Sequence, residues 1–184
     1  ALPICLTSIT EYSQHPDAKE LEEALELIAK GDRDALIRFY ESTKAAVYGF
    51  ALSILKNVQD AEDVLQESYL RVYAAAESYK PNGKPMAWLF TITRNLALMK
   101  IRKRSRIADL PQEDWERYYA DHPSITPDDR LVLQTAMQAL SSEEYQVVML
   151  HAVNGMKHRE IASILQLPLP TVLSKYHRAM KKLK

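Results

Sequence analysis

Apolar residues recur every three or four positions along most of the chain, which is the spacing that places them on one face of an α-helix. Runs of this kind cover residues 17–30, 34–57, 60–79 and 86–106. The chain has only four glycines, whereas a sheet with tight turns needs more. With 47% apolar and 26% charged residues, it has the composition of a globular protein. We therefore expect an all-α fold.

The third and fourth runs differ in character. The third begins with carboxylates, which favour a helix N-terminus, and we expect its buried face to contain Ala61, Val64, Leu65, Tyr69, Val72 and Tyr73. The fourth follows a "KPNGKP" loop of turn-forming residues. Its first half is apolar and aromatic, and its second half is cationic.

The helical period is lost at residues 107–126, which are rich in acidic residues and proline. We predict an acidic flexible linker there, between a helical domain at 17–106 and a second one at 127–184. Residues 1–16 are expected to form an N-terminal tail. Four short helices are expected in the second domain, from the sequences "DDRLVLQTAMQAL", "SSEEYQVVMLHAVNG", "KHREIASILQ" and "LPLPTVLSKYHRAMKKLK".

Charge is segregated along the chain although the formal net charge is zero. Residues 1–93 carry 9 basic and 14 acidic residues, and residues 94–106 carry 6 basic and none acidic. Residues 107–145 carry 2 basic and 9 acidic residues, whereas residues 146–184 carry 7 basic and 1 acidic. Two basic patches, each preceded by acidic sequence, indicate two contacts with a polyanion.

The last two predicted helices are separated by about three residues, which is the arrangement of a helix-turn-helix. Pro168 and Pro170 fall in the first turn of the second helix, where a missing N–H costs little, and we expect regular helix from Pro170. The outward positions are predicted to be Thr171, Ser174, Lys175, Arg178, Lys181 and Lys182. Hydroxyl and cationic side chains of this kind meet phosphates and base edges in DNA grooves.

Three segments together resemble the two conserved blocks of bacterial RNA polymerase sigma factors of the extracytoplasmic function (ECF) group in the sigma-70 family. They are "DAEDVLQESYLRVY", "MAWLFTITRNLALMKIRKR" and "LSSEEYQVVMLHAVNGMKHREIASILQLPLPTVLSKYHRAMKKL". The resemblance spans residues 17–184 around a variable acidic linker. It implies a protein that binds core RNA polymerase, recognises the −35 and −10 promoter elements and promotes DNA melting.

The resemblance also implies site residues in the first domain. Core polymerase would be bound by Asp60, Asp63, Gln66, Glu67 and Leu70. The loop at residues 78–84 would capture a flipped base of the single-stranded −10 element, where stacking surfaces and polar groups are needed. The −10 contacts would come from Tyr79, Lys80, Asn82, Lys84, Arg94, Asn95 and Arg102, with Lys100, Lys103 and Arg104 continuing along the strand.

In the second domain, the resemblance implies that the duplex −35 element is read by Arg159, Thr171, Ser174, Lys175, Arg178 and Lys181. Gln166 stands where the family usually has glycine in the turn, and Leu173 replaces a common basic residue. Leu173 could meet a thymine methyl group. An anti-sigma factor, often membrane-bound in this family, is a further implied partner.

Two other classes of protein share some of these features. A helix-turn-helix regulator with a helical sensor or dimerisation domain would explain the chain's end, but it would not need the basic fourth helix. A helical protein-interaction module would leave both basic patches without a purpose. The five histidines show no metal-ligand spacing and no nucleophile or phosphate-loop motif occurs, so we expect no enzyme, cofactor or metal.

The expected compartment is the cytoplasm. Cys5 is the single cysteine, which suits a reducing environment, and no apolar run reaches the roughly 18–20 residues that span a bilayer. We therefore do not expect a membrane protein, and the opening segment lacks the basic start of a secretion signal.

Overall fold

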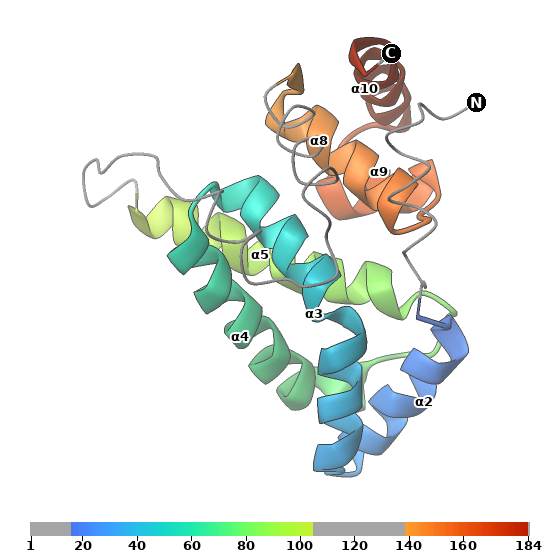
Figure 1. Ribbon diagram of the computed structural model, residues 1–184. Helices are drawn as coiled ribbons and strands as arrows, with labels where there is room; N and C mark the ends of the chain where they lie inside the picture. The colour runs from blue at the N-terminus through green and yellow to red at the C-terminus, as the bar shows by residue number, and fades with distance from the viewer. Residues whose placement is uncertain (1–15, 105–138, 184) are drawn as a thin grey trace, which may run out of the picture. The chain divides into compact units, whose positions relative to one another are not determined.

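Figure 1 shows the computed structural model, which describes residues 16–104 and 139–183. The described residues divide into two compact units, one that contains residues 16–55 and 59–104 and one that contains residues 139–183. The described residues form helices and turns without a strand, so the all-α prediction is confirmed for them. The predicted linker, the predicted tail up to residue 15 and residues 128–138 of the helix predicted over 128–140 lie outside the described residues. The predicted domain borders stay predictions.

The first unit contains α2 (Ala18–Ala29), α3 (Arg33–Leu55), α4 (Val58–Ala75), the 3₁₀ turn η1 (Ala76–Ser78) and α5 (Pro85–Arg104). Local chemistry sets several of the ends. The Asp17 carboxylate caps α2 by accepting from the Lys19 amide at 3.1 Å. Gly31 supplies the left-handed conformation after α2, with φ +86°. Pro85 opens α5, where its missing N–H has no helical partner anyway.

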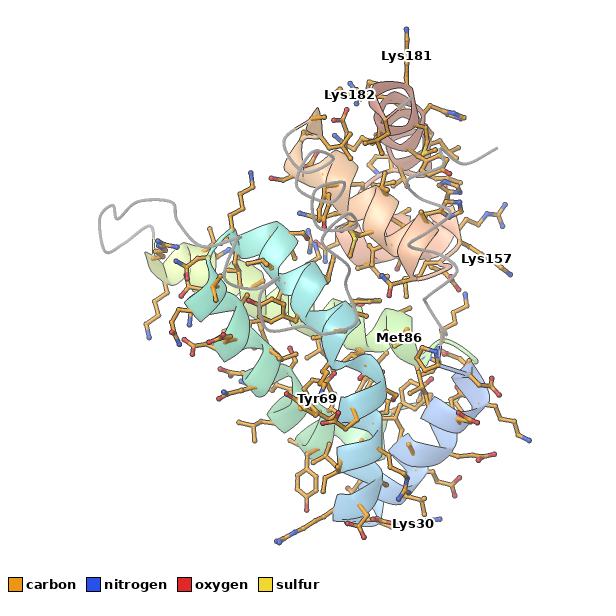
Figure 2. All side chains as sticks on the ribbon, viewed as in Figure 1. Lys30, Tyr69, Met86, Lys157, Lys181 and Lys182 are labelled. Atoms are coloured by element: carbon orange, nitrogen blue, oxygen red, sulfur yellow. The ribbon has the colours of Figure 1, made fainter. Side chains whose placement is uncertain are left out.

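One apolar core joins the four helices of this unit. Its buried members include Leu25 of α2, Phe39 of α3, Val72 of α4 and Leu89 of α5. Tyr69 lies between α4 and α3 (Figure 2), where its hydroxyl is 2.7 Å from that of Thr43. This packing fixes where the surface residues of each helix point.

The predicted buried face of α4 is correct at Ala61, Val64, Tyr69 and Val72. Leu65 is only partly buried, and the prediction for Tyr73 is wrong, because its side chain is 46% exposed. Helical spacing alone could not separate the edge of the apolar stripe from its centre. This leaves an aromatic side chain on the outer surface of α4.

The second unit contains α8 (Ser142–Val148), the π-helical turn η2 (Met149–Val153), α9 (His158–Leu165) and α10 (Leu169–Lys182). Ser141 and Glu144 form a capping box at the start of α8. The helix predicted over 141–155 is thus α-helical only in its first half, and its second half is widened into a π turn.

The helix-turn-helix prediction is confirmed in its geometry: three residues separate α9 from α10, and Gln166 begins the turn in the left-handed conformation, with φ +53°. The expected start of α10 at Pro170 is wrong by one residue. Pro168 is the N-cap, and its carbonyl accepts from the amides of Thr171 and Val172 at 2.9 and 3.1 Å. Leu169 is therefore already helical although a proline follows it.

Candidate functional site

The loop before α5 is positioned by contacts with α2. Tyr79 packs its ring against Trp88, with centroids 5.0 Å apart, and its hydroxyl donates to Glu22 of α2 at 2.8 Å. The Asn82 side-chain oxygen accepts from the Lys84 amide at 3.0 Å, and Gly83 adopts a positive φ of +72°. Lys80, Asn82 and Lys84 are exposed. Four of the predicted −10 residues therefore lie on this loop, and one of them, Tyr79, is a part-buried anchor of it.

Sequence reasoning missed the residue that organises this loop. A single oxygen of Glu22 accepts from Tyr79 Oη and from the backbone amides of Asn82 and Gly83, at 2.8, 2.9 and 2.7 Å. The tyrosine hydrogen bond and the amides lower the pKa of Glu22, so the side chain is an anion at neutral pH. Nothing local in the sequence signals this contact, because 57 to 61 positions separate the partners.

The remaining predicted −10 residues lie on α5. Asn95 and Arg102 are exposed, and Arg94 is half-buried, which lowers the pKa of its guanidinium through desolvation. The basic end of α5 faces the start of α4. Lys100 pairs with Asp63 and lies 3.4 Å from Asp60.

The two predicted polymerase-binding aspartates are thus engaged within the unit. Arg104 Nη1 also reaches Asp60, at 3.1 Å. The hydrogen bond from Lys100 lowers the pKa of Asp63. Burial alone would lower the pKa of Lys100, but its bonds to the two carboxylates raise it. These ion pairs fasten the start of α4 to the end of α5, so the acidic surface that the sequence suggested is partly neutralised.

The other predicted polymerase-binding residues form a more open surface on α4. Gln66 and Glu67 are exposed, and Leu70 is 71% exposed. Tyr73 completes this face, because positions 66, 70 and 73 follow one another at helical spacing. An exposed leucine beside an exposed tyrosine is a surface suited to a protein partner. The spacing from Gln66 could have identified Tyr73 as part of it.

An exposed stripe runs the length of α10. It consists of Leu173, Ser174, His177, Arg178, Lys181 and Lys182, which recur every three or four residues. Figure 2 shows Lys181 extending away from the helix. On α9, Arg159 is exposed, whereas Thr171 at the start of α10 is half-buried. His177 was missed as a member of this stripe, although it lies four residues after Leu173.

Lys175 does not belong to the stripe, so its predicted outward position is wrong. Its side chain is only 15% exposed, and its ammonium pairs with Glu143 at the start of α8. The neighbouring Glu144 is 5% exposed and receives Lys182 Nζ at 2.7 Å and Arg178 Nε at 3.8 Å. The bond from Lys182 lowers the pKa of Glu144, with help from the Ser141 amide. Two acids of α8 therefore bind three cations of α10.

Three histidines flank this arrangement. The ring centroids of His151 and His158 lie 4.1 Å apart. The ring centroid of Tyr176 lies 4.8 Å from that of His151 and 5.0 Å from that of His158. His151 Nδ1 contacts the Met156 carbonyl oxygen at 2.7 Å. Burial lowers the pKa of His158, and the charges of His151 and His177 lower it further. Across residues 16–104 and 139–183, no group of three or more His, Cys, Asp or Glu could hold a metal ion.

Comparison with known families and relatives accounts for both units. The sigma-70 region 2 family matches residues 39–107, and the sigma-70 region 4 family matches residues 130–183. The ECF RNA polymerase sigma factor EcfG of Rhodopseudomonas palustris is 31% identical over 156 residues, which cover 82% of this chain and 82% of EcfG. The chain belongs to the ECF sigma factors. The family resemblance is thereby confirmed, and the sigma factors to which the chain belongs are transcription regulators.

Other relatives agree. The ECF sigma factor SigE of Mycolicibacterium smegmatis is 35% identical to this chain. The match covers 85% of this chain and 64% of the length of SigE. SigW of Bacillus subtilis is 27% identical, with 89% of this chain and 95% of SigW covered. Two solved structures share the fold: CnrH in complex with the cytosolic domain of CnrY, and the sigma factor RpoE of Bartonella quintana in complex with the anti-sigma factor NepR.

The structural likeness covers most of each protein. CnrH is 22% identical, with a TM-score of 0.60 over 89% of this chain and 94% of CnrH. RpoE is 24% identical, with a TM-score of 0.59 over 79% of this chain and 92% of RpoE. In the described parts of the ECF sigma factor, no helix is long and apolar enough to cross a membrane.

Proposed function

We propose that this ECF sigma factor binds core RNA polymerase, directs it to promoters with −35 and −10 elements and promotes melting of the DNA. The observation that carries the proposal is the order of the two family matches, region 2 followed by region 4, in a chain whose second unit presents an exposed cationic stripe. A helix-turn-helix regulator with a sensor domain is disfavoured, because region 2 occupies the place of the sensor.

Polymerase would be bound by the outer face of α4. Gln66, Glu67 and Leu70 lie there, and Tyr73 extends the face by one turn. Apolar and aromatic side chains supply most of the free energy at such interfaces, because burying them removes about 25 cal/mol per Å² of unfavourable hydration. Asp60 and Asp63 would act at the edge of this face. There, replacing the ion pair between Lys100 and Asp63 by one between Asp63 and a basic group of the polymerase would change the free energy little.

The −10 contacts would come from the loop and from α5. Lys80, Asn82 and Lys84 are exposed on the loop, and Arg94, Asn95 and Arg102 follow on α5. Cations would hold phosphates, and the loop's polar groups would meet the edge of an unstacked base. Tyr79 would act by anchoring the loop, since its hydroxyl and ring are both engaged.

The −35 element would be met by α10 and α9. Ser174, Arg178 and Lys181 lie on the exposed stripe, with Thr171 at the helix start and Arg159 on α9. A helix of this kind fits the major groove, where arginine reads guanine and an apolar group meets the thymine methyl. Leu173 and His177 occupy the same stripe. Lys175 would support the helix through Glu143 instead of reading bases.

The proposal is tested by transcription with purified core polymerase. Adding the protein should yield run-off transcripts from double-stranded genomic fragments, and mapping their starts gives the promoter sequence. Core polymerase without the protein is the control. Tight binding of duplex DNA as a dimer in the absence of polymerase, without stimulated transcription, would contradict the proposal and favour a conventional regulator.

A further proposed partner is an anti-sigma factor. CnrH and RpoE share this fold, and the solved structure of each is a complex, with the cytosolic domain of CnrY for CnrH and with the anti-sigma factor NepR for RpoE. A protein that acts on polymerase and the chromosome would work in the cytoplasm and would have no enzymatic activity of its own. Affinity purification from the native host, in the absence of inducing stress, should recover one stoichiometric protein partner besides polymerase.

A further inference from the structure

Glu22 lies outside every segment so far assigned a role. It is on α2, before the region 2 match that begins at residue 39. It is nevertheless bonded to the loop that follows η1, since one carboxylate oxygen accepts from Tyr79 Oη, Asn82 N and Gly83 N. Three donors that converge on one oxygen make this the most extensively bonded contact between α2 and the loop.

Other contacts also shape the loop: the Tyr79 amide donates to the Ala76 carbonyl at 3.1 Å, and the Tyr79 ring packs on Trp88. Within it, Asn82 Oδ1 accepts from the Lys84 amide, which forms a tight turn through Gly83. The consecutive amides of Asn82 and Gly83 point the same way, and such concave pairs of N–H groups bind anions. Glu22 supplies that anion from a helix whose Leu21 and Leu25 are buried in the core. The loop is thus attached to a rigid support.

Occupation of this amide pair also affects what the loop can bind. A DNA phosphate would be the natural ligand of two converging backbone amides. With the Glu22 carboxylate in place, a phosphate is excluded from them by occupancy and by charge repulsion. The DNA backbone is then left to the cationic side chains, such as Lys80, and the polar edge of the loop remains for a base.

We propose that Glu22 is a positioning residue for base capture: it fixes the loop at residues 79–84 in the conformation that reads the −10 element and keeps phosphate out of the loop's amides. This inference rests on the proposed −10 role of the loop. It concerns sequence discrimination rather than affinity for DNA in general, because Glu22 shapes the base-reading surface without supplying a cation.

The test compares Glu22→Gln and Glu22→Ala with Glu23→Gln. Glu23 is the adjacent exposed glutamate, which lies 3.8 Å from Lys19 on the same helix, so it controls for the loss of one negative charge on α2. Holoenzymes are assembled with each variant. Binding is measured to a fluorescent single-stranded DNA selected from a random pool by the wild-type holoenzyme, and to the same DNA with one −10 base replaced.

The deciding quantity is the affinity for the selected DNA divided by the affinity for the DNA with one −10 base replaced. We expect the ratio to fall roughly tenfold for Glu22→Ala, the size of one well-placed base contact, and less for Glu22→Gln, whose amide oxygen is a weaker acceptor. Glu23→Gln should keep the wild-type ratio. Partial unfolding lowers the active fraction equally for both DNAs and leaves the ratio unchanged, so this readout separates positioning from stability.

Two results would overturn the inference: a wild-type ratio in Glu22→Ala, or an equal loss in Glu23→Gln. If wild-type holoenzyme itself fails to discriminate between the two DNAs, the proposed −10 function of the loop fails instead. Tyr79→Phe provides an independent check through the same contact. Its effect should be non-additive with that of Glu22→Ala, since both changes remove the same Tyr79–Glu22 hydrogen bond, and full additivity would count against a shared action.

Discussion

Glu22 in the first unit and Glu144 in the second each collect several donors beside residues proposed to meet DNA, but they do so in opposite ways. Glu22 accepts hydrogen bonds from two backbone amides and a tyrosine hydroxyl, and none of these three donors is a cationic side chain. Glu144 binds the cations themselves, Lys182 and Arg178. The first carboxylate sets the shape of a loop, whereas the second holds the charged side chains of a helix.

This difference teaches that a count of basic residues overstates the charge available to DNA in the second unit. Lys175 is engaged by Glu143, and Arg178 and Lys182 lie beside Glu144. A DNA phosphate must compete with these carboxylates for the three cations, so each cation contributes less to DNA binding than a free one would. In the first unit, the corresponding competition occurs at Lys100 and Arg104, which meet Asp60 and Asp63 on α4.

The largest effect is expected from Glu144→Ala. The change removes the capping box of α8 and the carboxylate that receives Lys182, so the second unit should lose about 2 kcal/mol of unfolding free energy. Hydrogen exchange of the α9 and α10 amides under mild denaturant measures the loss. The α4 amides of the first unit are the internal control, and equal acceleration there would contradict a local role.

Arg178→Ala should weaken binding of duplex −35 DNA roughly tenfold while leaving core polymerase binding unchanged. Its side chain is 59% exposed and its partner pair is long, so little stability is lost. Fluorescence anisotropy of the holoenzyme on a −35 duplex is the measurement. Lys175→Ala is the matched variant, and it should reduce DNA affinity less than Arg178→Ala; the reverse order would restore Lys175 as a base reader.

Gln166→Gly should stabilise the second unit by about 0.5 kcal/mol. Glycine removes the strain of a left-handed glutamine, and its greater conformational freedom in the unfolded chain offsets part of that gain. The first unit already has glycine in the left-handed conformation after a helix, at Gly31 beyond α2. Chemical denaturation of the full chain, followed by α9 amide exchange, detects the change. A destabilised variant would mean that the Gln166 side chain makes a compensating contact.

The smallest expected effect is a pH response confined to the second unit. Residues 16–104 contain no histidine, whereas His158 lies against His151 and Tyr176. The folded pKa of His158 is below its usual 6.5, so its contribution is fully present above pH 6.5 and is lost as pH falls through the lower folded value. Exchange of α9 amides, corrected for intrinsic rates, should accelerate as the pH falls below 6.5, and more than that of α4 amides.

His158→Leu tests the origin of that response. Leucine fills the site without a titratable group, and His158 Nε2 is buried with no hydrogen-bond partner to lose. The variant should therefore flatten the pH dependence. A response that persists unchanged would assign it to His151 or His177 instead.

Much of the fold followed from local sequence. Helical spacing and turn residues identified α2, α3, α5, α9 and α10 to within one or two residues. The apolar stripe is strong in α2, α9 and α10, whereas the start of α5 is marked by the "KPNGKP" loop and Pro85. Predictions were wrong where the periodic spacing of apolar residues was weak or ambiguous. Tyr73 sits at the edge of the α4 stripe and proved exposed, and η2 widens a segment whose local sequence is compatible with an ordinary α-helix.

The candidate sites divide in the same manner. The amino-acid sequence by itself determined the all-α class, the family and the stretches that carry the binding residues, since these depend on spacing and composition along the chain. Only the tertiary structure decided which charges are engaged: Glu22 with the loop, Asp60 and Asp63 with α5, and Glu143 with Lys175. These contacts join residues 32 to 61 positions apart, and the core packing that sets their distances leaves no periodic signal in the sequence.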